Sequence, residues 1–171
     1  MEILIVGILL VALMVYASTK IKRTATEAFE QERIETADYI VEKPEGFLNV
    51  LHPNSLLELD IYSRDFGVDH AASFRMAKAE LRRYKGWTVE QAVDAVGEAV
   101  KVNSTLSEVI DGKKYRVIEA ESVEKGAGFR ELYKLAEKEG DVYELKLQIL
   151  EDANEELNQK ADRMCASFEI K

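Results

Sequence analysis

The stretch YELKLQI at residues 143–149 decides the fold class. Its apolar residues alternate with charged or polar ones, the two-residue period of a β-strand that has one face on a core and the other in water. The segment that follows, 152–168, has a different period and places Leu157, Ala161 and Phe168 on one face of a helix. A strand of this kind followed by an amphipathic helix indicates a mixed α+β fold.

The spacing of apolar residues in the other segments brings the total to about four strands and four helices in one small soluble domain. The predicted strands are 33–41, 57–61, 115–121 and 143–149, and the predicted helices are 70–84, 89–100, 129–139 and 152–168. Thr88 and Gln91 have the spacing of a capping box at the start of the second helix. Asp111 and Gly112 predict a turn before the strand at 115–121.

Charge and cysteine content narrow the classes of function. The chain has 171 residues and a formal net charge of −9. Residues 24–171 carry 20 basic and 31 acidic residues, a net charge of −11. Binding to nucleic acid requires clustered cations, so no nucleic-acid partner is predicted. With Cys165 as the one cysteine, an internal disulfide is excluded, which agrees with a reducing compartment.

The N-terminal segment is strongly apolar. No charged residue occurs from Ile3 to Thr19, and Lys20, Lys22 and Arg23 follow at once. About 17 residues of helix rise roughly 25 Å, the short end of what crosses a hydrocarbon core. We therefore expect a transmembrane anchor that contacts the bilayer through residues 3–19. The alternatives are a cleaved secretory signal, whose cationic residues would precede the apolar run, and a buried core helix.

This reading divides the chain into an anchor at 1–19, a basic juxtamembrane turn and stalk at 20–32, and an acidic α+β domain at 33–171. Lys20, Lys22 and Arg23 would lie at the membrane interface. Because basic residues beside a span stay on the cytoplasmic side, the sequence predicts a single-pass membrane protein with a cytoplasmic domain.

Candidate catalytic residues are few. Asp65, Asp69 and His70 lie within six residues at a predicted strand-to-helix turn, and with His52 they could supply an acid and a base. The competing interpretation makes Asp69 a helix N-cap and His70 a surface residue. A metal ion needs three or four converging ligands, so no metal site is predicted. Cys165 lies on the apolar face of the last helix and is interpreted as a core residue.

One aromatic pair is a candidate binding site. Tyr84 and Trp87 flank a Lys-Gly turn, where exposed rings could form a docking point for a partner. Alternatively, Trp87 packs ahead of the Thr88 cap as a hydrophobic staple.

The function favoured by these observations is an accessory or interaction protein that presents an acidic α+β domain to a protein partner, as in a subunit of a membrane complex. The alternative is a membrane-tethered enzyme or a small-ligand-binding domain that uses His52, Asp65, Asp69 and His70. The sequence favours a non-enzymatic role and predicts no cofactor.

Overall fold

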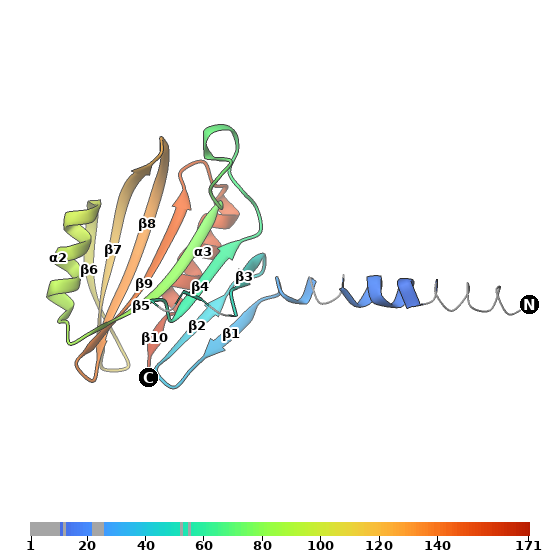
Figure 1. Ribbon diagram of the computed structural model, residues 1–171. Coiled ribbons are helices and arrows are strands. Elements are labelled where there is room, and N and C mark those ends of the chain that lie inside the picture. The colour runs from blue at the N-terminus through green and yellow to red at the C-terminus, as the bar shows by residue number, and fades with distance from the viewer. Residues whose placement is uncertain (1–10, 12, 22–25, 52, 55) are drawn as a thin grey trace, which may run out of the picture.

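The computed structural model describes residues 11, 13–21, 26–51, 53–54 and 56–171 (Figure 1). Its named elements are ten strands, two α-helices and one short 3₁₀ helix. The strands are β1 (Glu32–Glu35), β2 (Tyr39–Lys43), β3 (Phe47–Asn49), β4 (Leu59–Ser63), β5 (Ala77–Lys85), β6 (Lys101–Ile110), β7 (Lys113–Glu124), β8 (Ala127–Lys138), β9 (Asp141–Leu150) and β10 (Glu169–Ile170). The helices are η1 (Asp69–Ala71), α2 (Val89–Ala99) and α3 (Glu155–Ser167).

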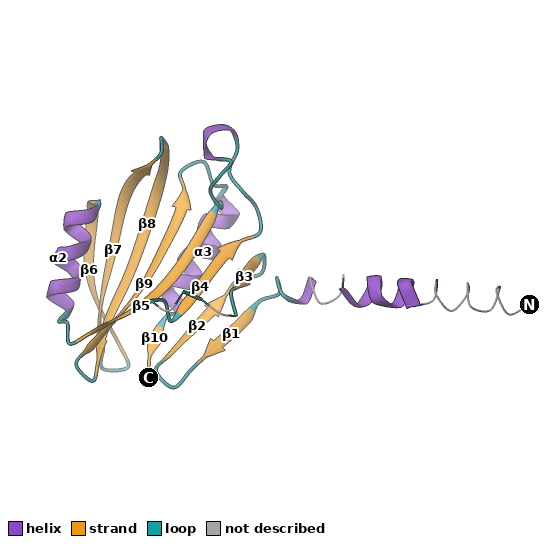
Figure 2. Cartoon of the chain, in the orientation of Figure 1, coloured by secondary structure: helices purple, strands orange, loops and turns teal. Residues whose placement is uncertain are grey.

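The strands form two antiparallel sheets, which dominate the structure (Figure 2). The large sheet has seven strands in the order β3-β4-β5-β9-β8-β7-β6. The small sheet has the order β1-β2-β10. The mixed α+β class predicted from the sequence is therefore confirmed, but the count of about four strands was too low.

Each face of the large sheet has its own core. On one face, here called the α3 face, Tyr143, Leu145 and Leu147 of β9 pack with α3 and the small sheet. On the opposite face, the α2 face, Val142 of β9 and Ile118 of β7 pack against α2. Full burial of a large apolar side chain contributes about 1.5–3 kcal/mol, so these two layers fix the sheet between the helices.

Two predicted helices are strands instead. The segment 70–84 contains η1 and β5, and 129–139 lies within β8. Both are rich in Ala, Leu, Lys and Glu, which favour helices in isolation. Tertiary pairing overrides this preference, because β5 is bonded between β4 and β9, and β8 between β7 and β9. β8 is covered on both faces, so its central residues are buried without alternation.

Tight turns set the boundaries of β8. Lys125 and Gly126 before it, and Glu139 and Gly140 after it, all have positive φ. Two consecutive residues of this kind form the hairpin turn whose twist matches antiparallel strands, and glycine is favoured there. Asp111 and Gly112 form the same kind of turn between β6 and β7, as predicted.

Several other predictions are confirmed. The strands expected at 57–61 and 143–149 correspond to β4 and β9, and the helices expected at 89–100 and 152–168 correspond to α2 and α3. The capping box is present, since Gln91 N donates to Thr88 Oγ1 at 3.3 Å and Thr88 N donates to Gln91 Oε1 at 2.9 Å.

The prediction of a single-pass membrane protein with a cytoplasmic domain is corrected by the structure. Among the residues that the structure describes, no helix is both long enough and apolar enough to cross a bilayer. Residues 13–21 are helical and exposed, and residues 3–10 and 12 of the predicted span lie outside the described residues. Lys20 is exposed, whereas Lys22 and Arg23 also lie outside the described residues.

Candidate functional site

The most unusual surface feature is the last strand of the large sheet. β6 pairs with β7 along one side, and its other side has no partner strand within the described part of the chain. All ten of its residues except Ile110 are exposed. Leu106 and Val109 are 60% and 67% exposed. Long, exposed edge strands with apolar side chains are templates for pairing with another chain.

Local sequence explains why β6 lies at this edge. Val100, the C-cap of α2, is already extended, so the chain passes from the helix into β6 without a loop. The Asp111-Gly112 turn then sends it back as β7. Neither helical layer covers the strand, since the α2 core involves β7, β8 and β9. The opposite edge of the sheet, β3, has only three residues.

A second feature is a hollow of about 220 Å³ between α2 and the large sheet, here called the α2 hollow. Its helical wall is made of small residues, Ala92, Ala95, Val96 and Ala99. The remaining residues that line it are Arg82, Tyr84, Trp87, Tyr133, Glu144 and Lys146. The small side chains of α2 leave this space open between the helix and the sheet.

A buried carboxylate, Glu131 of β8, lies near this hollow and is fully bonded. It is 1% exposed. Ser122 Oγ and Gln148 Nε2 donate to its Oε1 at 2.5 and 3.2 Å, and Tyr133 Oη donates to its Oε2. Lys146 Nζ lies 3.1 Å from the same Oε2. Burial would raise the pKa of Glu131, but these hydrogen bonds and the Lys146 charge outweigh it and lower the pKa.

The other buried carboxylate, Glu144 of β9, is in a poorer environment. It is 5% exposed, and Tyr84 Oη donates to its Oε1 at 3.2 Å. This bond is the one side-chain hydrogen bond to Glu144 found among the described residues. Burial raises the pKa of Glu144 above its ordinary value, despite the nearby charges of Arg82 and Lys146. The pKa of Glu131 is therefore lowered and that of Glu144 is raised, although both side chains lie on the α2 face of the sheet.

The predicted aromatic pair is present as a stack. The rings of Tyr84 and Trp87 are 4.9 Å apart at an interplanar angle of 27°. Trp87 lines the α2 hollow together with Ala92, the residue that a hydrophobic staple would contact, and still exposes part of its surface. Docking by this pair stays a prediction.

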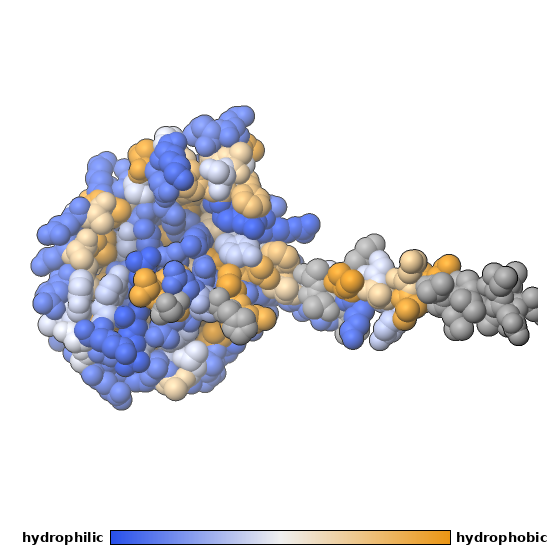
Figure 3. Space-filling view, in the orientation of Figure 1, coloured by the Kyte–Doolittle hydropathy of each residue, from blue (hydrophilic) through white to orange (hydrophobic). Residues whose placement is uncertain are grey.

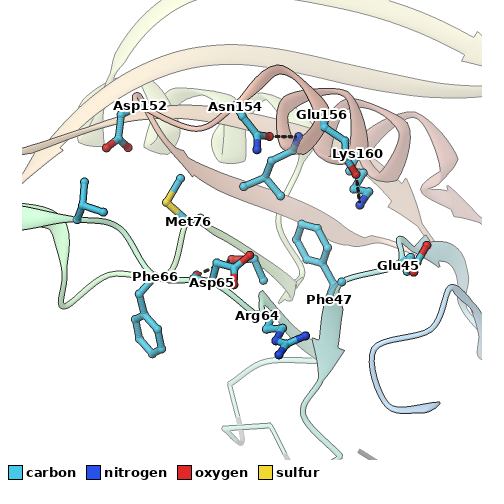
Figure 4. A pocket seen from close by; sticks show the side chains of 14 residues that line it. Glu45, Phe47, Arg64, Asp65, Phe66, Met76, Asp152, Asn154, Glu156 and Lys160 are labelled. Atoms are coloured by element: carbon cyan, nitrogen blue, oxygen red, sulfur yellow. Dashed lines mark hydrogen bonds and ion pairs between the residues drawn. The ribbon is translucent and has the colours of Figure 1, made fainter. Parts of the chain in front are cut away.

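Asp65 and His70 line separate hollows in the described part of the chain. Asp65 lines a hollow of about 370 Å³ between the strands β3 and β4 and the start of α3. Figure 4 shows Asp65 and Arg64 on one side of this hollow and Asn154, Glu156 and Lys160 on the other.

His70 lines a different hollow, beside Glu151 and Asp152. Asp69 belongs to η1 with a positive φ, and is not the residue that precedes this short helix. His52 lies outside the described residues. No group of three or more His, Cys, Asp or Glu side chains that could hold a metal ion occurs among the residues described.

Exposed apolar side chains also occur outside β6, for example Leu51, Leu56 and Val123. Figure 3 shows the face toward the viewer as mainly hydrophilic, with apolar residues in small, separate groups. Isolated apolar residues of this kind are ordinary on protein surfaces. The edge strand therefore differs from its surroundings through its unpaired backbone as well as its side chains.

Comparison with known proteins gives the fold but no family. No family model matches the sequence, and no curated protein matches it. The solution structure of cyanobacterial PsbP (CyanoP) from Synechocystis is similar, with a TM-score of 0.58 and 12% identity over 84% of this chain and 94% of that one.

Two further structures are similar at the same level. A crystal structure from Bacteroides thetaiotaomicron has a TM-score of 0.52 and 10% identity, over 78% of this chain and 45% of that one. A point mutant of the protein Mog1 has a TM-score of 0.50 and 11% identity, over 82% of this chain and 96% of that one. The chain thus has a fold like that of PsbP and Mog1.

The edge strand and the two buried carboxylates are not predicted from the sequence. β6 matches none of the strands predicted from the sequence, although the β-branched residues Val102, Thr105 and Val109 favour a strand in this segment. Glu131 fell within a predicted helix and was not considered. Glu144 was recognised only as a polar position of an alternating strand.

Proposed function

We propose that this chain is an interaction protein, an accessory subunit whose α+β domain binds a protein partner by adding an extended segment of that partner to β6. The observation that carries the proposal is the ten-residue edge strand, exposed along its length as far as Ile110. Strand addition obtains affinity from main-chain hydrogen bonds and specificity from side chains on alternate positions.

The side chains of β6 suit this mode of binding. Leu106 pairs with Val117 on the α3 face, and Val109 pairs with Lys114 on the α2 face. An added strand would therefore have an apolar neighbour on each face. β6 itself carries one cation, Lys101, and one anion, Glu108, so its net charge is zero within an acidic domain. A partner strand would meet little electrostatic repulsion there.

The alternative of an enzyme or a ligand-binding domain built on Asp65, Asp69 and His70 has less support. Asp65 and His70 line different hollows, and no hydrogen bond joins them in the described part of the chain. Catalysis by a pair of side chains requires both within hydrogen-bond reach of the reacting group.

Site-specific photocrosslinking tests the proposal. A photoreactive amino acid is placed at Leu106 in the full chain, in the cells that produce it. The matched control is Leu56, which is 77% exposed in the connection between β3 and β4. We expect a discrete protein adduct from position 106 and none from position 56. Equal adducts from both positions, or none from position 106, would contradict the proposal.

A further inference from the structure

We propose that the partner strand that covers β6 is the β6 strand of a second copy of this chain, paired antiparallel about a twofold axis at Leu106. This inference rests on the proposed function, since it names the partner of the same edge. The two seven-stranded sheets would join into one continuous sheet through their free edges.

The register of β6 and β7 assigns each side chain to a face. Thr105 is opposite Ile118, which packs in the α2 core, so Thr105 and Ser107 lie on the α2 face. Leu106 is opposite Val117 and lies on the α3 face with Ser104 and Glu108.

Symmetry then restricts the pairing. In an antiparallel pair, residues directly opposite each other lie on the same face of the sheet. A twofold axis normal to the sheet leaves each side chain on its own face, so residues opposite each other must be an even number of positions apart in the sequence. The axis therefore passes between the two copies of one residue, and that residue is opposite itself. Each residue on one strand is opposite the residue the same number of positions from the axis on the other strand.

Side-chain chemistry selects one of the allowed registers. With the axis at Leu106, the two exposed leucines contact each other, Thr105 is opposite Ser107 of the second copy, and Ser104 is opposite Glu108 of the second copy. With the axis at Thr105, Leu106 would be opposite Ser104. With the axis at Ser107, Leu106 would be opposite the charged Glu108. Of these three registers, only the one at Leu106 joins apolar to apolar, and it leaves no like charges opposite each other in this central segment.

Charge also favours self-pairing at this edge. Residues 24–171 have a net charge of −11, so two copies repel each other over most approaches. β6 carries only Lys101 and Glu108, which cancel.

The fold leaves room for the second copy. β6 is uncovered on both faces, because the α2 core involves β7, β8 and β9. The irregularity between Val102 and Ser104 limits regular pairing at the start of the strand. The ladder with the second copy would therefore be strongest from Ser104 to Glu108.

Cysteine crosslinking tests the register. Leu106→Cys is compared with Val109→Cys in the full chain, under mild oxidation. Residues 106 of the two copies would be directly opposite, within reach of a disulfide, whereas residues 109 would be about 20 Å apart. Cys165 is buried and does not compete. We expect dimer from L106C at about tenfold or more the yield from V109C at equal concentration. Equal yields, or more from V109C, would overturn the register.

Charged substitutions at Leu106 test whether the partner is a second copy of the chain. In sedimentation, the parent should show twice the 19.4 kDa chain mass. L106K and L106E should each weaken dimerisation by roughly tenfold, because like charges would be opposite each other, and an equal mixture of the two should restore the dimer. V109K is the matched control and should have a smaller effect.

The outcomes separate this inference from the proposed function. If the parent is a monomer while a photoreactive group at Leu106 captures a different protein, the second copy is wrong but β6 is still a binding edge. If the parent is a monomer and position 106 captures nothing, both proposals fail. A dimer that L106K leaves unchanged would place the interface elsewhere and would also overturn the inference.

Discussion

Replacement of Glu131 by glutamine should destabilise the domain far more than the same replacement at Glu144, although both side chains lie on the α2 face of neighbouring strands. Glu131 accepts hydrogen bonds from Ser122, Tyr133 and Gln148 and forms an ion pair with Lys146. Glutamine has one acceptor oxygen, so its amide nitrogen would face two of these donors.

The magnitude follows from these contacts. A hydrogen bond to a charged group contributes about 1.5–3 kcal/mol, and removal of one partner of a buried ion pair costs about 3–5 kcal/mol. Since Lys146 can turn toward solvent, we expect E131Q to lower the free energy of unfolding by about 3 kcal/mol. Glu144 accepts one hydrogen bond, from Tyr84, which glutamine can keep. We expect E144Q to change stability by no more than about 1 kcal/mol, toward greater stability at neutral pH.

Urea unfolding of the two variants and the parent measures this difference. With a slope of about 2 kcal/mol per molar urea, E131Q should lower the midpoint by about 1.5 M, and E144Q should leave it nearly unchanged. Because the two substitutions are chemically identical, each is the control for the other. Equal midpoints for the two variants, or a midpoint for E131Q within about 0.3 M of the parent, would show that the contacts of Glu131 do not stabilise the fold.

The stability difference between the parent and E131Q and the difference between the parent and E144Q depend on pH in different ways. The pKa of Glu131 is lowered in the folded protein, so its contribution is complete above the unfolded value near 4.5 and is lost as the pH falls through the folded pKa. The gap between parent and E131Q should therefore narrow in acid. The pKa of Glu144 is raised, so its protonated form stabilises the fold at low pH and this is lost as the pH rises. The advantage of E144Q should therefore vanish below the unfolded value.

Three further predictions concern single residues. Burial raises the pKa of the Cys165 thiol to about 11, so the thiol should react slowly with a thiol reagent until the protein is unfolded. In urea unfolding, C165D should lower the free energy of unfolding by several kcal/mol and C165A by about 1 kcal/mol. A Cβ at Gly67 would lie 2.6 Å from Leu150 Cδ1 and 2.7 Å from a backbone oxygen, so G67A should cost about 2 kcal/mol or more, and an unchanged melting temperature would contradict this. Thr88→Ala removes the bond to Gln91 N at the start of α2 and should cost about 1 kcal/mol, measured as a lower urea midpoint.

The parts of the fold that the sequence predicted well have one apolar face and one polar face. β9 alternates because one of its faces is apolar and the other carries Glu144, Lys146 and Gln148. α3 has an apolar stripe because only one side packs on the sheet, with Ala161, Met164 and Cys165 buried. In both cases the spacing of apolar residues along the sequence reflects which face of the element packs on the core.

The strands that the sequence did not predict lack this contrast between an apolar and a polar face. β8 is covered on both faces, so the segment 129–139 shows no alternation and its composition favours a helix. β6 is exposed on both faces, so it lacks a buried face and resembles a loop. The partners of Glu131 come from three strands, β7, β8 and β9, and no local pattern in the sequence indicates that they meet.

Hydrogen exchange at β6 tests most directly the claim that a second copy covers this edge. About half of the β6 amides point away from β7 and have no partner strand within the described chain. At high protein concentration we predict that the outward amides from Ser104 to Glu108 exchange slowly, and that they become fast after dilution, while amides inside β8 stay protected throughout. Fast exchange of these β6 amides at every concentration, with β8 still protected, would contradict the account.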